Sequence, residues 1–131
     1  MHPIHRITTY PYRSHVLRSP GTEKTRTNGE IVVEDDVWIC YGATILSGVR
    51  IGRGSVISAC SIITKDVPPY SVVINGEVKK YRFSEELRNR LVKVDLDKLK
   101  MLIDEEQIEK ILDQDITEEN IEDILIELEE K

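Results

Sequence analysis

Branched aliphatic residues recur at every sixth position through the middle of the chain. Counted from its first member, this series reads Val33, Ile39, Ile45, Ile51, Ile57, Ile63. A second series of small or β-branched residues follows four positions later, at Val37, Ala43, Val49, Ser55, Ser61, Val67. Glycines stand between these positions, where tight corners favour a residue without a side chain, at Gly42, Gly48, Gly52, Gly54.

A period of six matches neither the 3.6-residue repeat of an α-helix nor the two-residue alternation of a half-buried strand. It predicts short strands separated by corners and stacked in coils, so that each aliphatic packs on the aliphatics of the neighbouring coils. Two β-hairpins with accidental spacing are the alternative, but hairpins give no reason for a strict period of six. We therefore expect a mainly β fold built as a short β-helix of two to three coils.

The pattern becomes helical after Phe83. Ser84 precedes two glutamates, and apolar residues then share one helical face at Leu87, Leu91, Val94. A second helix is predicted behind Asp104, which forms a capping box with Gln107. A third is predicted from Thr117, with the apolar face Ile121, Ile124, Leu125, Leu128. We expect these helices to cover the C-terminal end of the coils or to pack around an oligomer axis, because an open coil end exposes strand edges.

Charge divides the 131-residue chain near the same place. Residues 1–94 carry 14 basic and 9 acidic side chains, a net of +5, whereas residues 95–131 carry 4 and 15, a net of −11. We predict an N-terminal segment with an excursion loop at 1–30, a coiled core at 31–82 and an acidic helical extension at 83–131. The total of −6 argues against nucleic acid as a partner, and no apolar run reaches the roughly 20 residues of a membrane span.

Two runs of the sequence resemble the hexapeptide-repeat acyltransferases, in the branch of the xenobiotic, chloramphenicol and sugar acetyltransferases. They are Val33-Glu-Asp-Asp-Val-Trp-Ile-Cys-Tyr-Gly-Ala-Thr-Ile-Leu-Ser-Gly-Val-Arg-Ile-Gly and Thr64-Lys-Asp-Val-Pro-Pro-Tyr-Ser71. The resemblance implies a left-handed parallel β-helix with three strands per coil, followed here by the α-helical tail. It also implies a homotrimer with active sites between subunits. The implied reaction moves an acetyl group from acetyl-CoA to a hydroxyl or amine of a sugar, capsule precursor or xenobiotic.

The family uses one histidine as general base. In its motif this histidine stands nine residues before the proline of a Ser-Thr-Tyr-Pro-aromatic run, and Thr8-Thr-Tyr-Pro-Tyr12 matches that run with Thr in place of Ser. His2 stands nine residues before Pro11 and is therefore the candidate base. His5 and His15 are interpreted as loop histidines.

The resemblance also indicates which residues hold the coenzyme. By position, the pantetheine arm is expected to pass Trp38, Tyr41 and Ala59. Thr64 and Lys65 are expected near the adenosine end, where the Lys65 ammonium would lie beside a phosphate. The alternative for Lys65 is a solvated lysine at the end of a coil.

One departure from the family bears on activity. Family members place several coils before the base, whereas Met1 alone precedes His2 here. Those coils would support the base and form part of the acceptor pocket. The chain therefore reads as one that lacks the N-terminal coils. The alternative function is a truncated or inactive hexapeptide-repeat protein that trimerises and binds CoA without turnover.

Histidine and cysteine usage bears on the remaining classes. A zinc carbonic anhydrase shares the architecture but needs several histidines on its coils, and no histidine follows His15, so no metal is expected. Two cysteines do not make a disulfide framework, which predicts a cytoplasmic protein. Cys40 and Cys60 are interpreted as packed, inert thiols.

Overall fold

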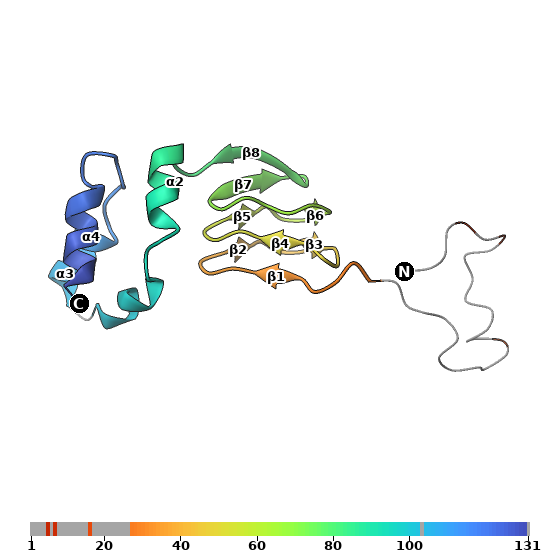
Figure 1. Ribbon diagram of the computed structural model, residues 1–131, viewed down its shortest axis with the longest axis horizontal. Helices are drawn as coiled ribbons and strands as arrows, with labels where there is room; N and C mark the ends of the chain where they lie inside the picture. The colour runs from red at the N-terminus through yellow and green to blue at the C-terminus, as the bar shows by residue number, and fades with distance from the viewer. Residues whose placement is uncertain (1–4, 6, 8–15, 17–26, 103, 131) are drawn as a thin grey trace.

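The computed structural model describes residues 5, 7, 16, 27–102 and 104–130. Short strands come first along this part of the chain, and helices follow them (Figure 1). The strands are β1 (Val32–Val33), β2 (Trp38–Ile39), β3 (Thr44–Ile45), β4 (Arg50–Ile51), β5 (Val56–Ile57), β6 (Ile62–Ile63), β7 (Ser71–Ile74), β8 (Glu77–Tyr81). The helices are α2 (Glu85–Leu91), the 3₁₀-helix η1 (Leu96–Met101), α3 (Glu105–Ile111), α4 (Ile121–Glu129).

The first six strands pair in parallel at a constant step along the chain. In β1 and β4, Val32 lies beside Arg50; the same step of 18 residues joins Trp38 to Val56 and Thr44 to Ile62. A step of 18 is three periods of six, so the chain passes through three small sheets before it returns to the first. The predicted repeat of short parallel strands is therefore confirmed, in an arrangement consistent with a short β-helix. We call residues 31–81 the strand stack.

The first aliphatic series points into the strand stack. Ile51 and Ile57 are 0% exposed, because each lies between residues of the coils on either side, and Ile63, paired with Ile45, is 1% exposed. Their counterparts one coil earlier are open: Val33 is 47% exposed and Ile39 is 40% exposed. The core of the strand stack therefore lies in its second coil, and the first coil leaves its aliphatics partly uncovered.

Three corners separate the strands. The first corner comprises residues 34–36, 52–54 and 68–70, the second 40–42 and 58–60, and the third 46–48 and 64–66. Gly54 shows why corners need glycine. Its φ is +67°, and a Cβ at this residue would collide with the ring of Tyr70.

The period shortens after β6, and the sequence prediction that Val67 belongs to the second series is wrong. Val67 lies beside Ile51, and Val72 lies beside Val56, each 16 residues further along rather than 18. Only three residues separate Ile63 from Val67, whereas five separate the corresponding positions one coil earlier. Val67 therefore enters the core, where it is 5% exposed.

The helical tail packs beside the first corner, so the expectation that it covers the C-terminal end of the coils is wrong. The chain reverses at Asn75 and Gly76, and β8 pairs antiparallel with β7, so this edge is already occupied. The ring of Tyr70 joins the tail to the first corner, in a buried cluster with Leu87, Leu91, Ile121. In Figure 1 the helices accordingly stand to one side of the strands.

Two of the three predicted helix starts are confirmed. The Ser84 hydroxyl accepts the N–H of Leu87, and the Asp104 carboxylate accepts the N–H of Gln107. The third helix begins at Ile121 rather than at Thr117, because the Thr117 and Asn120 side chains bond each other's backbone N–H and hold a separate turn. None of the described helices is long and apolar enough to cross a bilayer.

Candidate functional site

Tyr41 and Ala59 lie one above the other at the second corner. They are one coil apart, and the N–H of Cys60 donates to the carbonyl oxygen of Tyr41 at 3.0 Å. The Tyr41 side chain is 91% exposed, and Ala59 is exposed as well. The second corner therefore presents a flat aromatic and a small residue to solvent.

Trp38 lies on the same coil, at the start of β2. Its N–H donates to the carbonyl of Ser55 at 2.9 Å, and its backbone lies beside that of Val56. The indole is 66% exposed. The paired backbone thus holds the residue in place, while the strand pleat directs the ring outward, opposite to the inward-facing Ile39 side chain.

Thr64 and Lys65 lie at the third corner and border a cleft of about 380 Å³. The opposite wall comprises Gly76, in the turn that connects β7 to β8, and Glu77 and Val78 at the start of β8. The core residues Val67 and Val73 also line it. The cleft therefore combines an apolar base with a rim that carries an ammonium, a hydroxyl and the carboxylates of Asp66 and Glu77.

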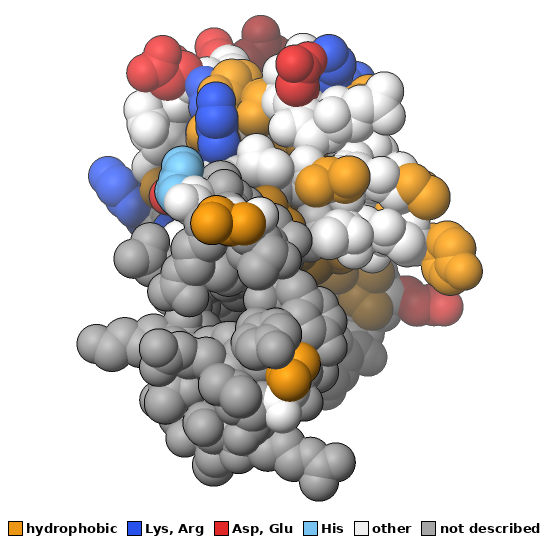
Figure 2. Space-filling view, turned by 90° about the vertical axis from the view of Figure 1, so that its right-hand side faces the viewer, with side chains coloured by type: hydrophobic (Ala, Val, Ile, Leu, Met, Phe, Trp, Pro, Cys, Tyr) orange, Lys and Arg blue, Asp and Glu red, His pale blue; other side chains and the backbone are white. Residues whose placement is uncertain are grey.

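The predicted coenzyme residues fall into two groups on the strand stack. Trp38, Tyr41 and Ala59 form the first group, and Thr64 and Lys65 form the second. Strand β6 lies between the groups, and its Ile62 side chain is 59% exposed. Five residues from Ala59 to Thr64 span at most about 17 Å at the rise of a strand. Figure 2 views the molecule from the right-hand side of Figure 1 and shows hydrophobic side chains at several levels along its right-hand edge, with charged side chains gathered at the top.

The structure does not describe the candidate base. His2 and His15 lie outside the described residues. His5 is described, and its side chain is exposed. The assignment of His2 therefore remains a prediction from the sequence motif.

The sequence reasoning missed a network of ion pairs at the first corner. Glu34 accepts from the Arg50 guanidinium at 2.8 Å, Asp35 lies 3.7 Å from that of Arg53, and Asp36 lies 3.4 Å from that of Arg82. The backbone N–H of Arg53 and then the guanidinium of Arg50 lower the pKa of Glu34. The sequence did contain a signal for this network: the acidic run Glu34-Asp35-Asp36 lies one coil before Arg50 and Arg53.

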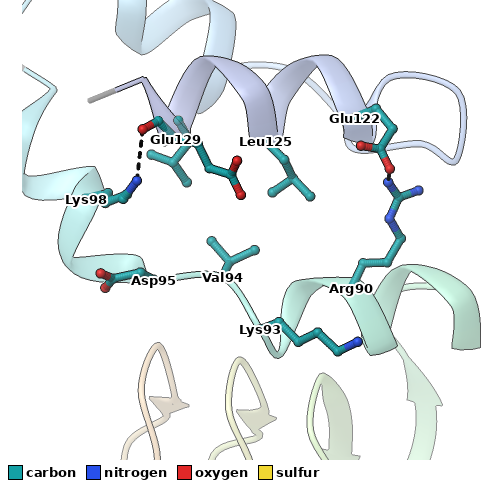
Figure 3. Close-up of a pocket in the computed structure, with 9 residues that line it drawn as sticks. Arg90, Lys93, Val94, Asp95, Lys98, Glu122, Leu125 and Glu129 are labelled. Atoms are coloured by element: carbon teal, nitrogen blue, oxygen red, sulfur yellow. Dashed lines mark hydrogen bonds and ion pairs between the residues drawn. The ribbon is translucent and has the colours of Figure 1, made fainter.

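A second cleft, of about 340 Å³, lies in the tail between α2, η1 and α4 (Figure 3). Its floor contains Leu125 and Leu128. Two of its cations already have partners, since Arg90 pairs with Glu122 and the Lys98 ammonium donates to the carbonyl of Glu129. None of the predicted coenzyme residues lines this cleft.

Cys60 differs from the sequence interpretation. It is exposed rather than packed, because its φ of +58° turns the side chain outward at the second corner, over Gly42. Cys40 is half-buried. Among the described residues, no three His, Cys, Asp or Glu side chains lie close enough together to hold a metal ion.

Comparison with known proteins accounts for the repeat. Residues 30–65 match the family model of the bacterial transferase hexapeptide (six repeats). Over 126 aligned residues the chain is 33% identical to a probable macrolide acetyltransferase of Lysinibacillus sphaericus, an alignment that covers 85% of this chain and 70% of that protein. The chain belongs to the hexapeptide-repeat transferase family. Its relatives are acetyltransferases of this type.

Other relatives match a smaller part of this hexapeptide-repeat protein. It is 43% identical over 60 residues to a chloramphenicol acetyltransferase of Klebsiella aerogenes and 39% identical over 79 residues to one of Morganella morganii. These alignments cover 44% and 55% of the chain. The chain spans only 29% and 38% of the length of those two relatives.

The alignment lengths also bear on the tail. An alignment over 85% of a 131-residue chain, about 111 residues, is longer than residues 1–82 and must include part of the helical extension. Alignments over 44% and 55% of the chain require no part of it. Similarity to the macrolide acetyltransferase therefore extends beyond the strand stack.

Proposed function

We propose that this chain is an acetyl-CoA-dependent O- or N-acetyltransferase acting on a small acceptor. One observation carries the proposal: Trp38, Tyr41 and Ile62 expose aromatic and apolar surface, and Lys65, three residues after Ile62, borders the cleft at the third corner. This set of residues is aromatic and apolar in its first part and carries an ammonium at its end. Acetyl-CoA has the same polarity, with an uncharged pantetheine arm at one end and phosphates at the other.

The proposed chemistry is acyl transfer without a covalent enzyme intermediate. The acceptor oxygen or nitrogen attacks the thioester carbonyl while His2 removes its proton. The tetrahedral oxyanion then collapses, the bond from carbon to sulfur breaks, and the CoA thiolate takes up a proton as it leaves. A backbone N–H would stabilise the oxyanion. A neutral imidazole suits the task because its ordinary pKa lies near the operating pH.

The proposed assembly is a homotrimer of left-handed β-helices with the coenzyme between subunits. Several large apolar side chains lie on the outer surface of the strand stack, including Trp38, Leu46, Ile62, Ile74. Burial of such residues between subunits would be favourable by roughly 25 cal/mol for each Å² removed from water. The two free thiols, Cys40 and Cys60, suit the cytoplasm.

A thiol-release assay tests the function. We expect acetyl-CoA with chloramphenicol, a macrolide, amino sugars and simple alcohols to release CoA in the presence of at least one acceptor. The exposed thiol of Cys60 also reacts with a thiol-specific reagent, so its signal is measured without acetyl-CoA and subtracted. Calorimetry measures CoA binding in parallel. Binding without release for any acceptor would favour the non-catalytic alternative, and a chain that does not bind CoA would overturn the proposal.

Sedimentation tests the assembly. We expect equilibrium sedimentation to give the mass of three 15.1 kDa chains at micromolar concentration. The physical reason is the exposed apolar surface on the strand stack, which a monomer leaves in water. A stable monomer that still turns over would remove the intersubunit site from the proposal.

A further inference from the structure

The acidic run at the first corner leads directly into the coenzyme surface. The acidic run comprises Glu34, Asp35 and Asp36. One residue separates it from β2, which begins with Trp38. Asp36 has a φ of +54°, a conformation that costs a side-chain-bearing residue energy unless its surroundings hold it. The position of this run therefore bears on how the indole is presented.

Arg53 joins this run to the helical tail. Its guanidinium donates to the carbonyl oxygens of Leu91 and Val92, at 3.3 and 2.9 Å, and lies 3.7 Å from the Asp35 carboxylate. Its backbone N–H donates to Glu34 at 2.9 Å. The carbonyls at a helix C-terminus have no partner within the helix, and a guanidinium can serve them and a carboxylate at once.

The burial of Arg53 shows how firmly this contact is made. Its side chain is only 11% exposed, and its Nε is buried without a hydrogen-bond partner in the described part of the chain. A buried donor without a partner is unfavourable, so the other contacts of the guanidinium must offset its cost. The residue is thus held between tail and corner rather than lying on the surface.

Arg82 makes a parallel connection. Its guanidinium donates to the carbonyl of Gly54 at 2.7 Å and lies 3.4 Å from Asp36. It also stacks on the rings of Tyr70 and Phe83, at 5.8 and 5.1 Å from their centroids. Both rings belong to the apolar cluster that anchors α2 and α4. Arg53 and Arg82 therefore both link the acidic run to the place where the helical tail packs on the first corner.

We propose that Arg53 is a positioning residue through which the helical tail holds the 34–36 corner and thereby sets the orientation of Trp38 toward acetyl-CoA. The proposal rests on the proposed function for the role of Trp38 in coenzyme binding. The link from Arg53 to the indole does not depend on that function. Loss of Arg53 should release the corner, increase the motion of the indole and weaken acetyl-CoA binding, while the chemical step is left largely unchanged.

The test compares Arg53→Gln with Arg50→Gln. Both replace an arginine of the second coil that pairs with the acidic run. Among the described residues, however, Arg50 makes no hydrogen bond or ion pair with the tail, and its side chain is 56% exposed. Trp38 is the only tryptophan, so the fluorescence anisotropy and acrylamide quenching of the free protein report on this indole alone. We expect Arg53→Gln to lower the anisotropy and to raise the KM for acetyl-CoA about 5–10-fold, with kcat within about twofold. Arg50→Gln should change each quantity less than about twofold.

Two further variants keep the test decisive. Asp35→Asn removes the ion pair but leaves the bonds from Arg53 to α2. It replaces Arg53→Gln in the test if that variant does not fold. We expect it to lower the anisotropy and raise the KM for acetyl-CoA by less than Arg53→Gln does. Arg53→Lys should recover part of the effect, since an ammonium cannot serve the carbonyls and the carboxylate together. Unchanged anisotropy and unchanged KM in Arg53→Gln, with only a lower Tm, would overturn the proposal. Lower anisotropy in a protein whose wild type fails to bind CoA would refute the proposed function while supporting the coupling.

Discussion

Replacement of His2 by alanine is expected to lower kcat for acetyl transfer by about 10²–10⁴-fold, the usual contribution of a positioned general base. The acceptor hydroxyl or amine must lose its proton as the bond to the acetyl carbon forms, and in our proposal no other group removes it. The thermal unfolding temperature should stay close to that of the wild type, because the proposed role of His2 is chemical. Thiol release at saturating acetyl-CoA measures the change.

The matched control for this variant is His5→Ala. His5 lies three residues away, and its side chain is exposed. Its removal should leave kcat within about twofold, since surface substitutions away from a site have small effects. The wild type should also lose activity as falling pH protonates an imidazole, and His2→Ala should lose that dependence. Full turnover in His2→Ala would show that another group is the base.

Replacement of Ile57 by alanine is expected to destabilise the protein by about 3–4 kcal/mol, within the range for an isoleucine removed from a packed core. Ile57 is 0% exposed and lies between Ile39 in the coil below and Val73 in the coil above. Truncation leaves a cavity that stacked coils cannot readily close, because backbone hydrogen bonds fix their spacing. Urea denaturation at a single protein concentration measures the loss.

Ile39→Ala is the control, because Ile39 occupies the same position one coil earlier. Its side chain is 40% exposed, so truncation removes less buried area and opens no closed cavity. We expect a loss of about 1 kcal/mol, in proportion to the smaller area that leaves the core. Equal losses in the two variants would contradict the observed difference in burial. The concentration must match because any oligomer makes apparent stability depend on it.

Much of the strand stack follows from local physics. A residue that returns to the same face every six positions must be apolar to be buried, and Ile51, Ile57 and Ile63 display that rule directly. The shortened step to Val67 does not follow from it, because the second series, counted by six from Ser61, also reaches Val67. Only the pairing of backbones shows that the third corner has lost two residues.

For the predicted coenzyme residues, too, the sequence indicated one part of the arrangement and the structure added another. The resemblance selected Trp38, Tyr41 and Lys65 one by one, and exposure in the structure is compatible with each. Their relation across Ile62, and the wall that the turn between β7 and β8 adds to the cleft, depend on a hairpin that the sequence reasoning did not predict. Contacts between distant segments carry no sequence periodicity, so pattern alone does not find them.

By itself, the sequence determined the repeat, the inward residues of the coils, two helix caps and the family, because each of these depends on residues that are close together or regularly spaced. The tertiary structure decided where the helical tail packs, how the last coil closes and which arginine joins the tail to the coils. Arg53 meets Leu91 and Val92 across 38 and 39 residues of chain. Such a contact depends on how whole elements dock through their apolar surfaces, and that docking appears only when the chain is folded.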